Sequence, residues 1–408
     1  MSCFGNAIIA QSGGPTSVIN NSVAGVVETW FARVPGSTIY AGVSGIKGIL
    51  EGHIIDLAAQ EKSVLDSLKY TPGAGLFSCR YKVSALDQQK LLEVFQKLNI
   101  RYFFYNGGND SMDTAYKTYM AARDASWDMR VIGVPKTIDN DLPFTDHTPG
   151  YGSAAKYIAV TVRETGIDLE SVSTKNKVTI LEAMGRNTGW LTAAGALAKR
   201  REDEAPHLLY LPEIPFSRQH FLADVERVYH QLGYCYVVVS EGLADVEGNY
   251  IASTSTRDAF GHSQLSGVGE ALKAMVEAEL GLKARCNTMG TTQRAAMHFA
   301  SLTDAKEAYM VGQAAVEYAL AGKSGLMVTI ERTTDEPYNS AAGEIGLEKV
   351  ANIERKLPRE WINAAGNYVK DNFIRYARPL IEGEVTLPMQ NGLPAYARLD
   401  FERGRVNI

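Results

Sequence analysis

The sequence predicts an α/β fold with mainly parallel sheets. Short apolar runs alternate with longer segments of helical periodicity along most of the 408 residues. This alternation is the pattern of βαβ units with right-handed crossovers. Glycine-rich and polar motifs directly follow several of the apolar runs. Because ligands bind at the carboxyl ends of parallel strands, these motifs also predict where a site lies.

The expected elements follow one another along the chain. The run NAIIAQ (6–11) predicts a strand, and the residues from about 18 to 33 predict a helix. The run YFFYN precedes a helix expected over about 110–123, and RVIGVP predicts the next strand. Further strands are expected in KVTILEA, HLLYLP, YVVVSEG and LMVTIER.

Two segments indicate where the domain organisation of the chain changes. The stretch LPFTDHTPGYGS is rich in loop formers and indicates a domain change just after TIDND. Beyond Arg332 the sequence predicts a polar, irregular segment (TTDEPYNSAAGE) and then a helix (WINAAGNYVKDNFIRYA), together an appendage to the core.

Composition excludes several classes of protein. The chain is 45% hydrophobic and 21% charged, as in ordinary globular proteins. Its net charge of −5 disfavours nucleic-acid binding, and it has no apolar run long enough to cross a membrane. The start does not resemble a signal peptide. The four cysteines have no metal-ligand spacing and indicate reduced thiols. We expect a cytoplasmic protein without nucleic-acid or membrane partners.

Two glycine-rich turns are candidate phosphate sites. Ser12-Gly13-Gly14 ends the first strand and opens a helix, where backbone amides can approach a phosphate. Arg80 follows a second glycine-rich turn and could bind a phosphoryl group through its guanidinium fork. Each has an ordinary explanation as well, since Gly-Gly turns are common and a lone arginine is more often a surface charge.

The motif VPKTIDNDLP carries the strongest local signal. Lys136, Thr137, Asp139 and Asp141 place both charges within six residues, just past an expected strand. Asp and Asn are common in ordinary turns. However, a carboxylate placed here can accept a proton from an attacking hydroxyl, and a neighbouring one can hold magnesium. We favour a catalytic function.

The stretch YNGGNDSMD raises a question about charge. Gly107 and Gly108 suit a phosphate, but the next pair, Asn109-Asp110, adds a carboxylate where a nucleotide's phosphates would be expected. Local pattern alone does not resolve this.

Two later motifs are individually ambiguous. Met184-Gly185-Arg186 and Glu241 follow two further expected strands, where a cation could bind a sugar phosphate and a carboxylate could accept hydrogen bonds from sugar hydroxyls. Other candidate phosphate ligands are Lys177, Arg285 and Arg294, although such residues are usually solvated.

In this order, SGGP, GGND, TIDND, MGR and SEG resemble the phosphofructokinase family, over residues 6 to about 331. The resemblance is nearest to the pyrophosphate-dependent branch, which typically has aspartate and lysine at the positions of Asp110 and Lys136, whereas the ATP-using branch has glycine at both. It implies a phosphofructokinase-like fold of two Rossmann-like α/β lobes with the active site in the cleft between them, plus a C-terminal appendage.

The resemblance also implies domain limits. A donor-binding lobe is expected at 1–140, completed by part of 285–331, and a sugar-phosphate-binding lobe at 141–284. A C-terminal helical or irregular extension is expected at 332–408.

The resemblance further implies the reaction, a reversible magnesium-dependent transfer from pyrophosphate to the 1-hydroxyl of fructose 6-phosphate. Asp110 would act as a filter, because the ATP α-phosphate would lie against the glycine of the ATP branch. Two like charges about 4 Å apart cost on the order of 4 kcal/mol at an effective dielectric constant near 20. Pyrophosphate has no α-phosphate and avoids this cost.

The resemblance also implies a role for each motif residue, by its position in the motif. Asp139 resembles the general base, and Lys136 would neutralise the transferring phosphoryl group. The diphosphate contacts would be Gly13, Arg80, Gly108 and Lys136. The sugar-phosphate contacts would be Thr137, Asp139, Met184, Gly185, Arg186, Glu241 and Arg294. The candidate magnesium ligands are Asp110, Asn109 and Asp141.

Lys177 and Arg285 match basic residues that family members lend from a neighbouring subunit, so a homodimer or homotetramer is implied. The sequence departs from the family at Asn109, where a metal-binding aspartate is frequent, and at Lys177, where arginine is usual.

Other functions remain open. One is an ATP-dependent 6-phosphofructokinase of the same fold, which Asp110 and Lys136 disfavour. Another is a non-catalytic regulatory subunit that binds sugar phosphate. Acceptors such as sedoheptulose 7-phosphate also remain open.

Overall fold

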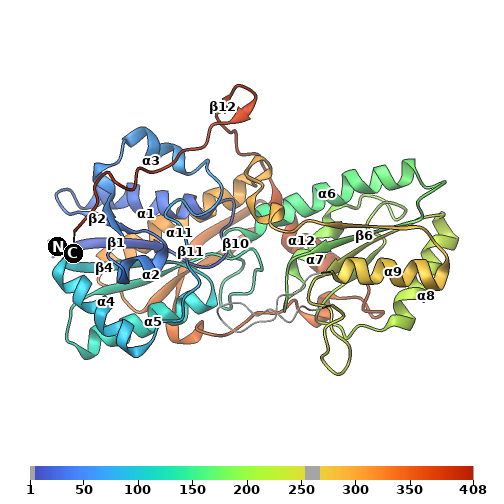
Figure 1. The fold of residues 1–408 in the computed structure, drawn as a ribbon, viewed down its shortest axis with the longest axis horizontal. Helices are drawn as coiled ribbons and strands as arrows, with labels where there is room; N and C mark the ends of the chain where they lie inside the picture. Colours follow the sequence, from blue (N-terminus) through green and yellow to red (C-terminus); the bar gives the residue numbers. More distant parts are fainter. Residues whose placement is uncertain (1–4, 253–266, 408) are drawn as a thin grey trace. The chain divides into compact units, whose positions relative to one another are not determined.

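The computed structural model describes residues 5–252 and 267–407, and the chain divides into two compact units. Unit 1 comprises Met1–Ser153, Arg294–Glu354 and Gly383–Ile408, and unit 2 comprises Ala154–Gln293 and Arg355–Glu382. Each unit is built around its own sheet, as Figure 1 shows. The predicted α/β fold with mainly parallel sheets is confirmed.

The sheet of unit 1 has seven strands in the order β11-β10-β5-β4-β1-β2-β3. Only the outer pairs, β2 with β3 and β10 with β11, are antiparallel, and the inner strands are parallel. Its strands are β1 (Asn6–Gln11), β2 (Ile39–Gly42), β3 (Ile54–Asp56), β4 (Ile100–Gly107), β5 (Arg130–Pro135), β10 (Leu326–Asp335) and β11 (Tyr338–Gly346). A small hairpin, β12 (Met389–Gln390) and β13 (Leu393–Pro394), also belongs to this unit.

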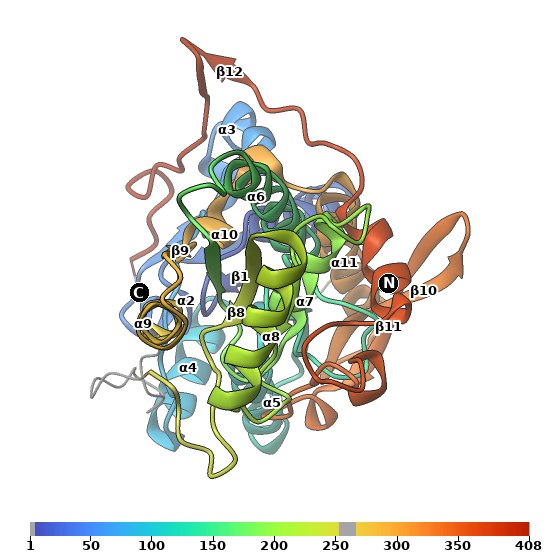
Figure 2. The same ribbon diagram turned by 90° about the vertical axis from the view of Figure 1, so that its right-hand side faces the viewer.

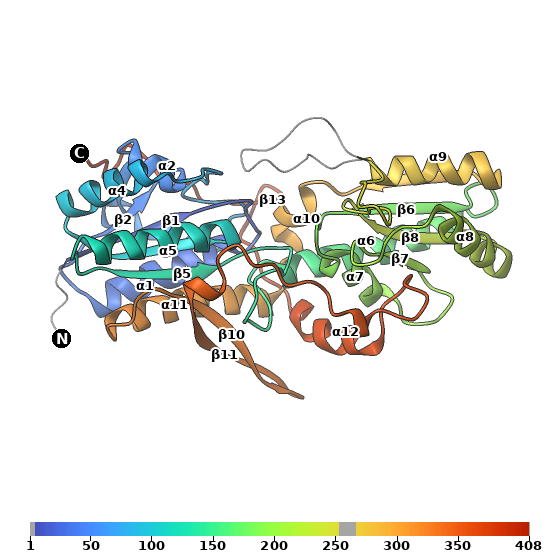
Figure 3. The same cartoon turned by 90° about the horizontal axis from the view of Figure 1, so that it is seen from below.

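Helices cover both faces of this sheet, because its inner strands are apolar on both sides. Ile9 and Phe104 pack in one core with α1 and α11, whereas Ile8 and Phe103 pack in a second core with α2, α4 and α5. The layers can be followed in Figure 3. The helices of unit 1 are α1 (Ile19–Arg33), α2 (Gly45–Leu50), α3 (Lys62–Leu68), α4 (Ala85–Lys97), α5 (Asn109–Asp124) and α11 (Leu302–Leu320).

Unit 2 has a four-stranded parallel sheet in the order β7-β8-β6-β9. Residues such as Ile180 and Val237 pack with α8 and α9 on one face (Figure 2). The strands are β6 (Val178–Ala183), β7 (Leu208–Tyr210), β8 (Cys235–Ser240) and β9 (Ala284–Thr288). The helices are α6 (Tyr151–Ser171), α7 (Trp190–Ala194), α8 (Arg218–Leu232), α9 (Val268–Leu280), α10 (Thr292–Ala295) and α12 (Asp371–Ala377), where α6 and α10 each have residues in both units.

Two boundaries differ from those expected. The change expected after residue 140 occurs after Ser153, because residues 145–153 are bonded to α11 and β10 of unit 1. The expected C-terminal extension of 332–408 does not form one body. Its first part completes the sheet of unit 1, Arg355–Glu382 belongs to unit 2, and the remainder returns to unit 1.

The secondary structure expected in this tail was partly wrong. The polar segment after Arg332 continues β10 and forms β11 instead of an irregular loop. An edge strand pairs through its backbone, so its exposed face can be polar. The expected helix starting near Trp361 begins only at Asp371. Gly366 has φ +77°, and Asn363 Oδ1 accepts the amide of Asn367 at 3.1 Å, which holds a turn there.

Within the described residues, no helix combines the length and apolarity needed to cross a membrane. Cys79, Cys235 and Cys286 are free thiols, of which Cys235 is buried. Cys3 lies outside the described residues.

Helices α1 and α11 pack closely through two glycines. A Cβ on Gly25 would lie 2.2 Å from the Tyr309 carbonyl oxygen, and a Cβ on Gly312 would lie 2.2 Å from the Ser22 carbonyl oxygen. Neither carbonyl can move without shifting its helix. The close contact therefore depends on glycine at both positions.

We predict that Gly312→Ala destabilises unit 1. Helix propensity alone would stabilise the variant by about 1 kcal/mol, but overpacking this contact costs about 1–3 kcal/mol. Urea unfolding followed by circular dichroism measures the change, and a higher unfolding midpoint than that of the wild type would contradict the close packing.

Candidate active site

The candidate donor site in unit 1 forms where three neighbouring parallel strands end. β1 pairs with β4, so that Gln11 lies opposite Asn106, and β4 pairs with β5, so that Gly107 lies opposite Pro135. The motifs that follow these strands therefore share one edge of the sheet. The predicted site residues in unit 1 are Gly13, Arg80, Gly108, Asn109, Asp110, Lys136, Thr137, Asp139, Asp141 and Arg294.

The glycine turn after β1 holds a buried lysine. Lys136 is 3% exposed, and its Nζ donates a hydrogen bond to the Gly14 carbonyl oxygen at 2.7 Å. Gly13 has φ +78°, and a Cβ there would lie 3.2 Å from Lys136 Nζ. Glycine at this position thus permits both the turn and the close approach of the lysine.

Two arginines lie beside the same turn. A Cβ on Gly14 would lie 2.7 Å from Arg294 Nη1 and 4.0 Å from Arg80 Nη2. Arg80 follows Cys79, whose carbonyl oxygen accepts the Gly13 amide at 3.1 Å. The structure therefore groups Arg294 with Gly14 and Arg80 in unit 1, whereas the sequence predicted for it a sugar-phosphate contact. Three cations surround one turn, an arrangement that favours an anion.

Burial and the neighbouring charges shift the pKa of Lys136. Burial lowers the pKa of Lys136 to about 8, and Arg294 and Arg80 lower it further, while Asp139 and Asp141 oppose the shift. Burial likewise lowers the pKa of Arg294, and the charge of Arg80 adds to this effect. An anionic ligand at the turn would relieve the repulsion among these cations.

The second component of the candidate donor site is the start of α5. Gly108 precedes the helix, and Asn109 and Asp110 lie in its first turn. A Cβ on Gly107 would lie 2.1 Å from Ser111 Oγ, so this glycine allows the strand to pass directly into the helix. The positive end of the helix dipole consequently lies at the same sheet edge as Lys136.

The loop after β5 presents the candidate base. Thr137 Oγ1 accepts the backbone amide of Asp139 at 3.0 Å, which orders the loop beside the Lys136 site. Asp139 is half-buried and interacts electrostatically with Lys136 and Arg294. A carboxylate held in this way can accept a proton from a bound hydroxyl.

Asn109 and Asp141 form an incomplete polar pair. Asn109 Nδ2 donates to Asp141 Oδ2 at 3.3 Å, whereas Asn109 Oδ1 and Asp141 Oδ1 are buried without a hydrogen-bond partner among the described residues. Burial raises the pKa of Asp141 to about 7, with further contributions from Asp139 and Glu354. In the part of the chain that the structure describes, no three His, Cys, Asp or Glu side chains are grouped as a metal site.

Unit 2 places Met184, Gly185, Arg186 and Glu241 at the carboxyl ends of β6 and β8. Gly185 has φ +113°, and its carbonyl oxygen accepts Ser240 Oγ at 2.6 Å. A Cβ on Gly242 would lie 1.7 Å from the Arg186 carbonyl oxygen. These contacts hold the Met184–Arg186 turn against the residues that follow β8.

Glu241 and Arg186 are electrostatic partners in this turn. Burial raises the pKa of Glu241 to about 7, while Arg186 acts in the opposite direction. Arg186 Nε is buried and has no hydrogen-bond partner in the described chain. A donor and an acceptor are thus available for a ligand with both a phosphate and hydroxyl groups.

Lys177 and Arg285 lie at the other end of the same sheet. Lys177 directly precedes β6, and Arg285 pairs with Thr179 near the beginning of that strand. A strand of 6 residues spans roughly 20 Å. These two cations are therefore separated from Met184–Arg186 of the same unit.

The sequence interpretation missed the residues that support the base loop. Thr145, His147 and Thr148 are buried, although their segment had been interpreted as a loop at a domain change. The Asp146-His147 pair was a local signal, since a carboxylate next to a histidine can form an ion pair, as it does here.

Comparison with known proteins identifies the family. The phosphofructokinase family model matches residues 6–319. A pyrophosphate–fructose 6-phosphate 1-phosphotransferase from Halomonas elongata is 44% identical over 405 residues, covering 98% of this chain and 97% of the relative.

Solved structures agree over nearly the whole chain. A pyrophosphate-dependent phosphofructokinase from Nitrosospira multiformis has a TM-score of 0.92 at 43% identity and covers 100% of this chain and 98% of its own. The enzyme of the same description from Marinobacter aquaeolei has a TM-score of 0.90 at 44% identity, covering 99% and 98%. On the strength of its motifs, its sheet-edge geometry and these similarities, the chain belongs to the phosphofructokinase family.

Proposed function

We propose that this protein transfers a phosphoryl group from pyrophosphate to the 1-hydroxyl of fructose 6-phosphate, giving fructose 1,6-bisphosphate and phosphate in a reversible reaction. The observation that carries the proposal is the end-to-end similarity to a pyrophosphate–fructose 6-phosphate 1-phosphotransferase, at 44% identity. The cationic turn of unit 1 supports an anionic donor at that edge of the sheet.

Pyrophosphate binds in this proposal at the glycine turn and the start of α5. Gly13 and Gly108 contact it through the backbone, and Arg80 and Lys136 provide positive charge. Arg294, which was predicted to contact the sugar phosphate, has its guanidinium beside Gly14 and so adds positive charge next to the donor turn. As negative charge develops on the transferring phosphoryl group, these cations stabilise it.

A magnesium ion fits the donor set. Asn109 and Asp141 each have a buried side-chain oxygen without a partner in the described residues, and amide and carboxylate oxygens are suitable ligands for this ion. Magnesium usually takes few protein ligands and completes its coordination with phosphate oxygens and water, which agrees with the absence of a larger acidic cluster among the described residues. When bound, it would neutralise pyrophosphate charge, with Asp110 as a further candidate ligand.

Asp139 is the proposed general base. Its carboxylate takes the proton of the sugar 1-hydroxyl, whose oxygen then forms a bond to the nearer phosphorus of pyrophosphate. The bond from that phosphorus to the bridging oxygen breaks, and phosphate leaves. Lys136 holds the pyrophosphate in position and Thr137 holds the sugar phosphate. Catalysis therefore comes mainly from positioning and charge stabilisation.

The sugar phosphate is bound by residues of unit 2 in this proposal. Arg186 binds phosphate, Met184 and Gly185 contact the sugar phosphate, and Glu241 accepts hydrogen bonds from sugar hydroxyls. Lys177 and Arg285 serve the site of a neighbouring subunit, in a homodimer or homotetramer. Their separation from Arg186 within unit 2 supports this assignment.

We predict that the wild-type protein, purified alone, uses pyrophosphate and not ATP. Asp110→Gly should gain measurable ATP-dependent turnover and lose pyrophosphate-dependent turnover, because the carboxylate no longer repels an α-phosphate. Asp113→Gly, on the same helix, is the matched control and should leave the donor ratio unchanged. Comparing kcat/KM for the two donors tests the filter.

Each outcome of this comparison has a defined meaning. A wild type that prefers ATP would refute the pyrophosphate assignment, and a wild type inactive with both donors would favour a regulatory subunit. If Asp110→Gly has no ATP activity, the filter is wrong and the adenosine site itself is missing. Sedoheptulose 7-phosphate can be tested as acceptor in the same assay.

We also predict that Asp139→Ser retains sugar-phosphate binding but loses turnover by about 10²–10⁴-fold, the usual contribution of a positioned base. The exposed Asp128, which pairs with Arg130, provides the control Asp128→Ser. Initial rates and calorimetric binding of fructose 6-phosphate separate catalysis from affinity. Turnover within a few-fold of the wild type would remove Asp139 from the mechanism.

A further inference from the structure

The segment Thr145–Gly150, here called the strap, holds the loop that bears Asp139. The amide of Thr137 donates to the Pro149 carbonyl oxygen at 3.2 Å, and Thr148 Oγ1 donates to the Thr137 carbonyl oxygen at 2.9 Å. The backbone amide of Thr148 donates to Asn140 Oδ1 at 3.1 Å. The strap is therefore bonded to the loop on both sides of Asp139.

One of these bonds supports an unfavourable backbone conformation. Asn140, directly after Asp139, has φ +55°, a left-handed conformation that non-glycine residues adopt infrequently. Its side chain is fully buried and accepts the Thr148 amide. The strap thus compensates for the conformation that turns the chain at the candidate base.

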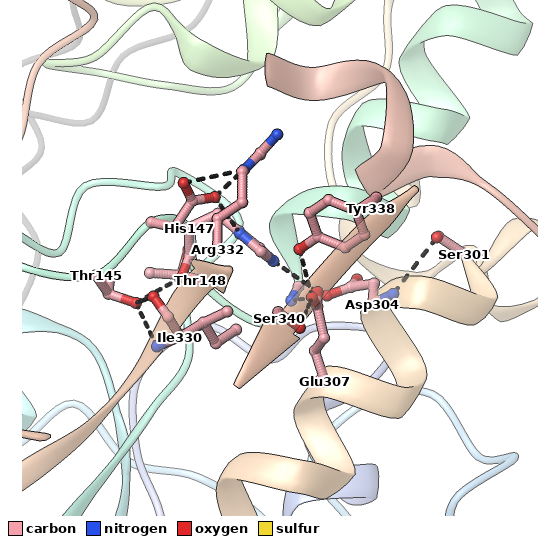
Figure 4. Close-up of polar contacts among 12 residues, drawn as sticks. Thr145, His147, Thr148, Ser301, Asp304, Glu307, Ile330, Arg332, Tyr338 and Ser340 are labelled. Carbon is pink, nitrogen blue, oxygen red and sulfur yellow. Dashed lines mark hydrogen bonds and ion pairs between the residues drawn. The ribbon is translucent and has the colours of Figure 1, made fainter. Parts of the chain in front are cut away.

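A buried ion cluster anchors the strap to α11, as Figure 4 shows. His147 is 1% exposed, with Nε2 2.6 Å from Glu307 Oε2 and Nδ1 2.8 Å from Asp146 Oδ1. Burial alone would lower the pKa of His147, but the two carboxylates raise it to about 9. At neutral pH the ring is an imidazolium that donates to both carboxylates.

Further side chains bond both carboxylates of the cluster. Arg332 Nη2 donates to Asp146 Oδ1 at 3.0 Å, while the hydroxyls of Tyr338 and Ser340 donate to Glu307 Oε1 at 2.5 and 2.7 Å. His147 and Arg332 thus face the carboxylates of Asp146 and Glu307, and Arg332 also pairs with the exposed Asp335. Removing one partner of such a buried group leaves the others uncompensated and is strongly destabilising locally.

A second carboxylate of α11 holds the far end of the strap. Asp304 is 1% exposed and accepts the backbone amides of Gly150 at 2.8 Å and Ser153 at 2.9 Å. It lies one helical turn before Glu307. The same face of α11 therefore binds the strap at two points.

We infer that Thr148 is a positioning residue for Asp139, and that the Glu307–His147 ion pair is the anchor that keeps Thr148 in place. The inference rests on the proposed role of Asp139 as base. The strap does not contact a substrate in this account. It fixes the geometry of the base, so its loss should lower kcat with little effect on substrate affinity.

The first test uses substitutions at Thr148. Thr148→Val removes the hydroxyl but keeps the shape, and should lower kcat about 10-fold or more, since small misplacements of catalytic groups cost up to about 10²-fold. The KM values for pyrophosphate and fructose 6-phosphate should change less than two-fold. Thr148→Ser, which keeps the donor, should restore most of kcat.

The control is Thr118→Val. Thr118 is fully buried, and its hydroxyl lies 2.9 Å from the Thr114 carbonyl oxygen and 3.1 Å from Gln88 Oε1. This variant loses a buried hydroxyl donor away from the loop and should keep wild-type kcat. Hydrogen exchange of peptides that cover residues 137–141 should become faster in Thr148→Val but not in Thr118→Val.

The second test concerns the anchor. Glu307→Gln should lower kcat and accelerate exchange in the same peptides, and the double variant with Thr148→Val should be less impaired than the product of the single effects, because both act through one segment. Multiplicative losses would overturn the link between anchor and Thr148. Wild-type kcat in Thr148→Val would overturn the positioning role, whereas full activity of Asp139→Ser would instead refute the proposed base.

Discussion

The hydrogen bond from Lys136 Nζ to the Gly14 carbonyl oxygen connects the two halves of the donor site. It joins the residue that follows β5 to the turn that follows β1, across the intervening end of β4. The amine can reach that carbonyl because Gly13 has no side chain in its path. Burying a cation there is costly unless an anion lies nearby, so the site is electrostatically suited to an anionic ligand.

Both units form their candidate sites at glycine-containing turns, but the polar groups beside these turns differ. In both, turns at the carboxyl ends of parallel strands contain glycines whose Cβ atoms would collide with neighbouring groups. Unit 1 adds cations and a base loop at this edge, and unit 2 adds the Arg186–Glu241 pair. The C-terminal residues are divided between the two units instead of forming a separate layer. The site chemistry thus depends on the ends of strands whose interiors are almost entirely apolar.

The sequence predicted best where apolar runs and motifs coincide. Both β1 and β5 have the predicted bounds, because each is a continuous buried run that ends in a recognisable turn. The exposed strand β11 was missed, since backbone pairing at a sheet edge leaves no apolar pattern. The strap was also missed: of the two carboxylates that bond His147, Asp146 is adjacent in the sequence, but Glu307 lies 160 positions later. The partner that fixes the strap to α11 therefore cannot be found from local pattern.

The most direct test of the buried-lysine account is calorimetric titration with magnesium pyrophosphate at pH 8, in buffers of different ionisation enthalpy. Since the pKa of Lys136 is lowered to about 8, part of the lysine is neutral before binding. Binding of the anion should protonate it, so the wild type should take up more protons per site than Lys136→Arg, whose guanidinium is always charged. Equal proton uptake by the two proteins would contradict the account.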